Sequence, residues 1–459
     1  MILLPPELEK ILHETPELKE TYFVGGCVRD ALLKIPHKDF DIEVFGVGYE
    51  QLVNALSPWG RTDLVGRSFG VVKLTLKNRN TFDFAIPRRD SKIAAGHQGF
   101  DIQFDLTFTP KEAAARRDFT INSLMFDPRK KELLDFFGGE KDLKEKILRH
   151  TSDAFPEDPL RVLRGMQFAA RFDLQAAPET VSLCQKIKTH YSELALERVR
   201  EEWFKWAEKS SVPSAGLKFL VATEWIDHFP ELKNLIGTPQ DSEWHPEGDV
   251  FTHTCHCCDA LVKLSEWQNA DTESRIVYLL ATLLHDVGKP QTTSREFKNG
   301  RERIISPGHE SVGVSVAENF LNRINAPAAI RDRVLPLVAN HMAHYQTVSD
   351  RAVRRLANRL YPENIQGLCL VMTADRGGRP PLPAIIPPGA TALLEKAHAL
   401  ELQKSAPKPI LLGRHLMELG MTPGKNFGAI LNAAFEAQLE GEFFDLPQAL
   451  EWLKKRLQK

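Results

Sequence analysis

Hydrophobic and polar positions follow two different patterns in the first third of the chain. Short apolar runs, partly alternating with polar residues, are typical of β-strands, whereas the segment that begins at Asp30 has the pattern of a helix. The runs predicted as strands are Tyr22–Val24, Phe40–Val44, Val71–Leu76 and Thr81–Ala85. This alternation predicts an α+β module over residues 1–145, with a mixed sheet and flanking helices.

The pattern becomes helical further along the chain. From Leu194 to Leu220, charged positions alternate at helical spacing with Trp203, Phe204 and Trp206, which predicts an all-α neck. The proline-rich residues 380–390 indicate a connector to a helical C-terminal segment. Because 459 residues exceed one ordinary hydrophobic core, we expect three or four modules.

Composition and charge restrict the class of protein. Charged residues make up 26%, hydrophobic residues 42%, and the formal net charge is -2. This charge provides no chain-wide attraction for a polyanion, so nucleic-acid binding would need local basic patches. A signal peptide and a long apolar run are both missing from the sequence, and six cysteines suit reduced thiols. We therefore expect a cytoplasmic protein with no membrane segment.

Residues 21–45 contain a glycine pair, a cation and two carboxylates in close succession. Gly25 and Gly26 let backbone N–H groups approach an anion, and Arg29 follows on the next turn. Asp39 and Asp41 alternate with apolar residues, so one strand should present both carboxylates on one face. Their hard oxygens suit Mg²⁺, which completes its shell with substrate phosphates. The combination predicts nucleotidyl transfer.

Asp83 and the segment 87–110 follow this stretch in the sequence and are also candidates for the site. Asp83 lies on a strand-like segment that could pair near Asp41, so it is either a third acidic site residue or an outward strand residue. Residues 87–110 are polar, long and contain glycine, which indicates a mobile loop beside the site.

Adjacent guanidinium groups follow that segment. Arg116 and Arg117 are placed to grip a triphosphate bidentately, and Asp118 and Asn122 to hold ribose hydroxyl groups. The alternative is a surface cluster of salt bridges.

The segment Pro156–Arg164 opens another helix, and Glu157 lies in its first residues. Asp158 and Arg161 lie three positions apart on one face, and Arg164 extends that face. An acceptor beside a donor fork matches cytosine and adenine, which both carry an amino donor next to a ring-nitrogen acceptor. Alternatively, Asp158 is simply the helix N-cap.

A second group of imidazoles and carboxylates lies after residue 244. The candidate ligands are His253, His285, Asp286 and Asp375, and further histidines occur at His309, His341 and His344. Mixed nitrogen and oxygen donors suit a divalent transition metal. Cys255, Cys257 and Cys258 also suggest structural zinc, but no second cysteine pair completes four ligands, so buried helix cysteines are the preferred interpretation.

Basic residues cluster on a later helix and at the C-terminus. The predicted phosphate-backbone contacts are Arg351, Arg354, Arg355 and Arg359 on one helical side, and Lys454, Lys455 and Arg456 in the tail.

In this order, the motifs resemble the class II tRNA nucleotidyltransferases, the CCA-adding enzymes, and the related bacterial poly(A) polymerases. The matching motifs are GGCVRD with DFD, RRDFTIN, LLDFFGG, EDPLR and ERVREE, over about the first 205 residues. The resemblance implies metal at Asp39 and Asp41. It also implies nucleotide contacts from Gly26, Arg29, Arg117, Asp158, Arg161 and Arg164, to which the residue pattern adds Gly25, Asp118, Asn122 and Glu157.

The stretches WHPEGDVFTH and LLHDVGK are similar to the HD phosphohydrolase domain that some of these enzymes carry. This implies metal ligation by His253, His285, Asp286 and Asp375, and phosphatase or 2′,3′-cyclic phosphodiesterase activity. The predicted architecture is a nucleotidyltransferase head (1–145), a helical neck for nucleotide selection and RNA binding (146–240), an HD domain (241–380) and a helical tail (381–459).

The leading functional hypothesis is addition of CCA to tRNA from CTP and ATP, with Mg²⁺ in the head and a transition metal of unknown identity in the HD domain. The alternatives are a poly(A) polymerase, an enzyme that adds only CC or only A, or an HD phosphohydrolase with a nucleotide-binding head.

Overall fold

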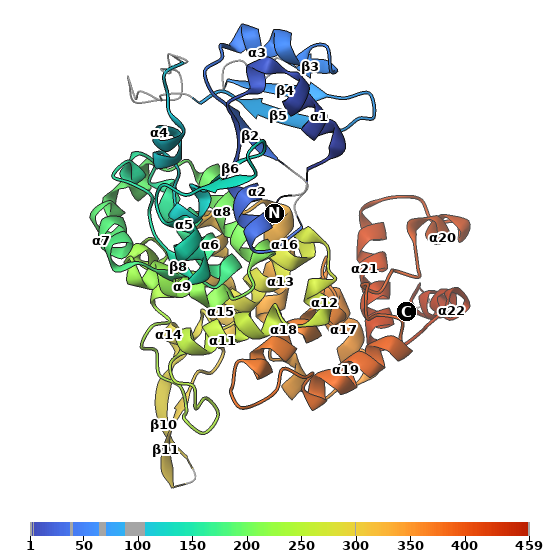
Figure 1. Cartoon of the computed structure of the whole chain (residues 1–459). Helices are drawn as coiled ribbons and strands as arrows, with labels where there is room; N and C mark the ends of the chain where they lie inside the picture. Colours follow the sequence, from blue (N-terminus) through green and yellow to red (C-terminus); the bar gives the residue numbers. More distant parts are fainter. Residues whose placement is uncertain are drawn as a thin grey trace. The chain divides into compact units, whose positions relative to one another are not determined.

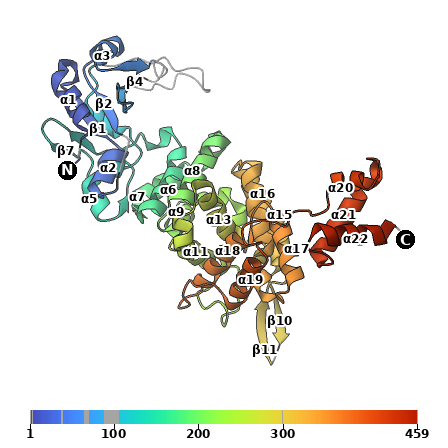
Figure 2. The ribbon, with the colours of Figure 1, turned by 90° about the vertical axis from the view of Figure 1, so that its right-hand side faces the viewer.

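The computed structural model of the chain divides into two compact units, and each is described by itself. The first comprises Met1–Ala169 and Asp173–Glu193, and the second comprises Ala170–Phe172 and Leu194–Lys459. The structure describes residue 2 and residues 4–36, 40–63, 70–87, 106–298 and 300–457. Figure 1 and Figure 2 show the ribbon in two views. Asp39 and most of the predicted loop at 87–110 lie outside the described residues.

The described part of the first unit contains a mixed sheet of seven strands. These strands are β1 (Thr21–Val24), β2 (Asp41–Val44), β3 (Arg61–Asp63), β4 (Val71–Thr75), β5 (Thr81–Ala85), β6 (Met125–Asp127) and β7 (Glu132–Leu134). Their order across the sheet is β3-β4-β5-β2-β1-β6-β7. β2 pairs antiparallel with β1 and parallel with β5. Because β2 is hydrogen-bonded on both sides, the residues at its start have a fixed place in the sheet.

The two faces of β2 differ because side chains alternate along a strand. Ile42 and Val44 are 1% and 0% exposed and join a hydrophobic core with Phe23 and Phe84 from the neighbouring strands. The polar positions of β2 point to the opposite face. The period of two in the sequence therefore separates the core from the acidic face.

The helices of the first unit surround this sheet and continue beyond it. They are α1 (Pro6–Glu14), α2 (Gly26–Leu32), α3 (Tyr49–Leu56), α4 (Pro110–Ala115), α5 (Gly139–Lys144), α6 (Leu160–Phe172), which ends in the second unit, and α7 (Pro178–Lys186). Two short strands, β8 (Ile147–Leu148) and β9 (Gln175–Ala176), pair in parallel. The prediction of a helix that starts at Asp30 is wrong in its first residue. This helix is α2, and it already begins at Gly26, directly after the turn at Gly25.

The second unit is mainly helical. Its helices are α8 (Leu196–Lys209), α9 (Pro213–Ala222), α10 (Pro230–Lys233), α11 (Val250–Leu261), α12 (Ser265–Gln268), α13 (Thr272–Leu284), α14 (Lys289–Thr292), α15 (His309–Arg323), α16 (Ala328–Asn340), α17 (Asp350–Leu360), α18 (Ile365–Gly377), α19 (Pro388–Ala399), α20 (Gly413–Glu418), α21 (Lys425–Glu440) and α22 (Leu446–Leu457). A hairpin of β10 (Ser294–Lys298) and β11 (Arg301–Ile305) projects from these helices in both views (Figure 1, Figure 2). The all-α prediction missed this hairpin.

Helix α8 has the apolar face that the sequence indicated. Trp203 and Trp206 are fully buried, and the ring of Trp203 lies 5.0 Å from that of Phe229 and 5.1 Å from that of Phe320. Burial of large aromatic rings is strongly stabilising. The predicted neck helix therefore contributes to the core of the second unit.

The predicted arginine surface on α17 is corrected by the structure. The guanidinium group of Arg354 is buried and donates to the carbonyl oxygen of Leu439 at 3.0 Å. Arg355 pairs with Glu436 at 2.9 Å and with Glu440, and Arg351 also pairs with Glu440. These three arginines join α17 to α21. Only Arg354 is buried, whereas Arg351 and Arg359 are exposed, so a phosphate contact stays a prediction for those two.

Across the described ranges, every helix is either too short or too polar to cross a lipid bilayer.

Candidate functional sites

The first site lies where β2 begins, on the polar face of the sheet. Asp41 is exposed and lies opposite Asp83 of β5 in the parallel register. Residues opposite each other in neighbouring strands present their side chains on the same face. The predicted pairing of the Asp83 segment with this strand is therefore confirmed. Asp83 also lies 3.6 Å from the Lys73 ammonium group.

The turn before α2 brings a glycine, an arginine and this acidic face together. Gly25 has φ +68°, a conformation that L side chains rarely adopt. A Cβ atom there would lie 2.7 Å from Arg117 Nη1 and 3.8 Å from Asp41 Oδ2. Arg117 Nη2 is 2.6 Å from Glu43 Oε1 on β2. Position 25 must therefore lack a side chain. Glu43, two residues beyond Asp41 on the same strand face, is a site residue that sequence reasoning did not identify.

A largely buried network joins Arg29 of the head to Arg164 of α6. Arg29 donates through Nε to Asp30 at 2.8 Å and through Nη1 to Asn122 Oδ1. Asn122 donates to Asp118 Oδ1 at 2.9 Å, and Asp118 Oδ2 accepts from Arg164 Nε at 2.7 Å. Four predicted nucleotide residues from separate segments of the sequence are thus hydrogen-bonded to one another.

Asp118 is the centre of this network. Burial by itself would raise the pKa of its carboxyl group, but the Arg164 charge and hydrogen bonds from Asn122, Arg164 and the Phe119 N–H group outweigh burial. The pKa is therefore below its ordinary value, and the carboxylate stays ionised while it orients its partners.

The start of α6 fixes the residues of the EDPLR motif. Arg161 donates to the carbonyl oxygens of Ala154 and Arg116, both at 2.7 Å. Asp158 Oδ1 accepts from the Leu160 N–H group at 3.2 Å, but the N-cap of α6 is Pro159 and no side chain caps this helix. Asp158 is therefore not the N-cap, and a base contact by its carboxylate stays a prediction. Glu157 is exposed, with a carboxylate oxygen 3.9 Å from Arg116 Nη2.

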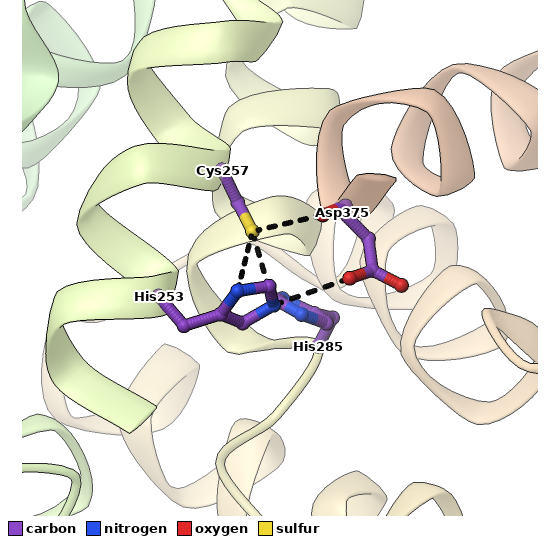
Figure 3. A group of neighbouring side chains, drawn as sticks. All are labelled: His253, Cys257, His285 and Asp375. Atoms are coloured by element: carbon purple, nitrogen blue, oxygen red, sulfur yellow. Dashed lines mark hydrogen bonds and ion pairs between the residues drawn. The ribbon is translucent and has the colours of Figure 1, made fainter. Parts of the chain in front are cut away.

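The second site is a buried cluster inside the second unit. Its elements are α11, the end of α13, the start of α15, the end of α16 and α18. His253 Nε2 lies 3.1 Å from Asp375 Oδ1 (Figure 3). Among the described residues, three groups of donor atoms each lie within 4.8 Å of one another. The first is His253, Cys257, His285 and Asp375, the second is Asp286, His309 and His341, and the third is His245, Glu247 and His253. All four predicted ligands are therefore brought together.

Backbone contacts orient three of the histidines in the same way. The Nδ1 atoms of His285, His309 and His341 lie 2.7–2.8 Å from the carbonyl oxygens of Thr282, Ser306 and Val338. Each carbonyl can only accept a hydrogen bond, so these contacts assign a proton to Nδ1 and direct Nε2 into the cluster. The Nε2 atoms of His309 and His341 face each other at 3.1 Å. With Nδ1 protonated on both rings, a second proton or a bound cation must lie between these two Nε2 atoms, and a metal ion bound by both would satisfy them.

Asp286 lies between the first two groups. Its Oδ2 atom is 3.2 Å from His285 Nε2 and 3.7 Å from His253 Nε2, while its Oδ1 atom is 3.2 Å from His309 Nε2 and 3.8 Å from His341 Nε2. One carboxylate oxygen therefore faces each group, which is the arrangement of a carboxylate that bridges two metal ions.

Charged side chains around the cluster hold its members in place. Glu247 Oε1 accepts from His253 Nδ1 at 2.7 Å and lies 2.8 Å from His245 Nδ1. Although burial opposes ionisation, these hydrogen bonds lower the pKa of Glu247 to about 2. Lys289 lies 2.6 Å from Asp286, and Arg379 lies 3.0 Å from Asp375. Glu247, Lys289 and Arg379 were missed as orienting residues, although Glu247 and Lys289 belong to the quoted motifs WHPEGD and LLHDVGK.

The structure also shows where the further histidines and the three cysteines of α11 lie. His309 and His341 complete the second group, whereas His344 bonds to the carbonyl oxygen of His341 at 3.2 Å and belongs to none of the three groups. Cys255, Cys257 and Cys258 are all buried, as preferred from the sequence, but Cys257 also belongs to the first group. The spacing of histidines could identify candidates, but only the fold could divide them.

Comparisons with known proteins match two ranges of the chain, one in each unit. Residues 21–149 match the family described as the Poly A polymerase head domain, and residues 250–376 match the HD domain family. A "Multifunctional CCA protein" of Vibrio vulnificus is 34% identical over 376 residues, covering 78% of this chain and 86% of that protein. A protein of the same name from Mannheimia succiniciproducens is 34% identical over 381 residues, with 78% and 84% covered.

Solved structures with a similar fold cover nearly the whole chain. The CCA-adding enzyme of Bacillus stearothermophilus in complex with CTP has a TM-score of 0.65 at 19% identity, with 99% and 98% of the two chains covered. The CCA-adding enzyme of Thermotoga maritima complexed with tRNA has a TM-score of 0.60 at 21% identity, with 99% and 97% covered.

Proposed function

The chain belongs to the family of the multifunctional CCA proteins, and from this membership we propose that it adds C, C and A to the 3′ end of tRNA without a nucleic-acid template. The observation that carries the proposal is the 34% identity that extends over 86% of a relative with that name. CTP, ATP and tRNA occur in the solved CCA-adding enzymes and are the substrates and partner proposed for this chain. We assign nucleotidyl transfer to residues 1–145 and base selection with RNA binding to residues 146–240.

The acidic face of the sheet suits Mg²⁺ in the head. Asp41, with Asp39 before it, supplies hard carboxylate oxygens, and the exposed Asp83 lies beside Asp41 in the register. Magnesium bound there would activate the primer 3′-hydroxyl group and neutralise the leaving pyrophosphate. Gly25 leaves room for the guanidinium group of Arg117, which Glu43 holds and which would supply a fixed positive charge for the substrate phosphates.

The buried arginine network and the start of α6 would select the nucleotide. Two backbone carbonyl groups fix the guanidinium of Arg161, so its direction is set before a base arrives. Together with Asp158 it offers a donor and an acceptor in the order that cytosine and adenine require. Arg29, Asn122, Asp118 and Arg164 hold one another and thereby keep this part of the head rigid.

For residues 241–380 we propose a metal-dependent phosphohydrolase that acts on phosphate esters such as 2′,3′-cyclic phosphates. The cluster fits a divalent transition metal because the Nε2 atoms of its histidines are directed inward and His285 Nε2 is buried without a hydrogen-bond partner. A metal held there would supply an activated water molecule. His253, His285 and Asp375 would hold one ion, His309 and His341 a second, and Asp286 would contact both.

One assay tests the proposal in the head. The purified protein is incubated with tRNAs that end at the discriminator base, at C or at CC, and with each nucleoside triphosphate separately. We expect C to be added to the first two substrates, A to the third, and the reaction to stop there. Long A tails on unrelated RNA would instead identify a poly(A) polymerase, and addition of only C or only A would identify a partial enzyme.

A further inference from the structure

Cys257 is a thiol inside a cluster of nitrogen and oxygen ligands. It lies one helical turn after His253 on α11, so both side chains leave the same face of the helix. Its Sγ atom is 3.3 Å from His253 Nε2 and 3.8 Å from the Asp375 carbonyl oxygen (Figure 3). With metal–sulfur bonds of about 2.3 Å and metal–nitrogen bonds of about 2.0 Å, two ligands of a tetrahedral ion lie roughly 3.5 Å apart. The separation of sulfur and nitrogen thus agrees with two ligands of one metal ion.

An independent observation at the same place indicates a ligand. His285 is 1% exposed, its Nδ1 atom is occupied by the Thr282 carbonyl group, and its Nε2 atom makes no hydrogen bond although Asp286 Oδ2 lies 3.2 Å away. This Nε2 atom belongs to the group that contains Cys257 Sγ and Asp375. A buried lone pair directed at a thiol and a carboxylate is costly when nothing lies between them, and a cation removes this cost.

The packing of α11 leaves space for the thiol at this position. A Cβ atom at Gly378, which follows α18, would overlap Cys257 Sγ and would lie 3.1 Å from His253 Cε1. The glycine therefore lets the sulfur approach the end of α18, where Asp375 lies. Cys255 and Cys258 are also buried on α11 but belong to none of the ligand groups among the described residues. Burial in a helix alone therefore does not account for the place of Cys257.

We propose that Cys257 is a thiolate ligand of the metal ion held by His253, His285 and Asp375, which makes this half of the centre selective for thiophilic divalent cations such as Zn²⁺, Co²⁺ or Cd²⁺. On binding, the S–H bond breaks, the metal–sulfur bond forms and the proton passes to the buffer. Soft sulfur donors favour such ions over Mg²⁺ and Mn²⁺, which prefer oxygen. This inference rests on the proposed metal centre of residues 241–380.

The test uses full-length protein, stripped of metal and titrated with Co²⁺ under reducing conditions. A cobalt ion bound to thiolate has a charge-transfer band in the near ultraviolet, which nitrogen and oxygen ligands do not produce. We expect this band in the wild-type protein and in the matched control Cys258→Ser, and we expect it to be lost in Cys257→Ser and Cys257→Ala. Cd²⁺ affinity should fall by about 10- to 100-fold in the Cys257 variants, with a much smaller change for Mn²⁺.

The outcomes separate this inference from the proposal on which it rests. Cobalt binding without the band in the wild-type protein, or a band that persists in both Cys257 variants, would overturn the role of Cys257 and leave the metal centre intact. Failure of the wild-type protein to bind Co²⁺ or Cd²⁺ would overturn both. Thermal unfolding of each variant is measured in parallel. If Cys257→Ala unfolds like the wild type and also keeps its Cd²⁺ affinity, Cys257 is only an apolar core residue.

Discussion

The two proposed metal sites are built in opposite ways. In the head, Asp41 and Asp83 are exposed on the polar face of a sheet, and neither is buried by the protein around it. In the helical unit, His253, His285 and Asp286 are 0–2% exposed. Exposed carboxylates carry little desolvation cost and leave coordination positions for substrate phosphates, as Mg²⁺ requires. Buried carboxylates need positive partners, which Lys289 and Arg379 supply in part and a bound cation would complete. The difference indicates that the substrate would supply the remaining metal ligands in the first site, whereas protein side chains would supply them in the second.

The largest expected effect tests the open site. Asp41→Ala should reduce nucleotide incorporation by at least about a thousandfold, roughly 4 kcal/mol of transition-state stabilisation, because a metal carboxylate acts on the transition state. Binding of tRNA should hardly change, since phosphate contacts supply most of that affinity. Incorporation is measured with radiolabelled CTP, and binding by filter retention. Glu132→Ala, an exposed acidic change on β7 of the same sheet, is the control. Normal incorporation by Asp41→Ala would refute the site.

A double variant tests the buried site of the helical unit. Replacing His285 and Asp286 with alanine should empty the buried cluster and remove metal-dependent phosphodiesterase activity by about a thousandfold, while CTP and ATP incorporation continues. Metal content by mass spectrometry and both activities are measured. The control is His398→Ala, an exposed histidine on α19. If the histidines only join helices, both activities should fall together with the melting temperature.

Asp118→Asn tests how much the buried network contributes to the unfolding free energy, in contrast to the exposed acidic face. We expect a loss of about 2–3 kcal/mol of unfolding free energy at pH 7, because Arg164 loses its buried partner. The pKa of Asp118 is lowered in the folded state, so its contribution is complete above the unfolded value, about 3.8, and is lost as the pH falls through the folded value. Chemical denaturation of variant and wild type should therefore converge in acid. A difference that is constant with pH would contradict this, and Asp153→Asn, an exposed change, is the control.

The smallest effect concerns base choice. Asp158→Ala should weaken discrimination against UTP and GTP by roughly tenfold, since one base contact is worth about 1–3 kcal/mol. The ratio of kcat/KM for CTP and UTP measures this loss. If the variant is less stable but equally selective, the contact with Leu160 N–H is the whole role of Asp158.

Sequence reasoning reached the parts of each site that lie in one motif. The period of two around Ile42 predicted β2 and its acidic face, and the Asp83 pairing followed from a second strand of the same kind. The division of the buried histidines into two groups around Asp286 could not be predicted, because it depends on the ends of α13, α15 and α16 meeting in space. Glu43 and Glu247 were missed for the same reason, since each is recognised only by its partner. The ion pairs of Arg351 and Arg355 could not be predicted either, because their partner Glu440 lies 85 or more positions later.

The contact between Arg354 and the Leu439 carbonyl group also affects the order in which the helical unit folds during synthesis. The guanidinium group is 8% exposed, and its backbone acceptor lies 85 residues further along the chain. During synthesis the earlier segments of a protein emerge and begin to fold first. Helix α17 can form while α21 is still being made, but its arginine has no acceptor from Leu439 until that residue leaves the ribosome. The helical unit therefore reaches its final packing only after residue 439 has been made.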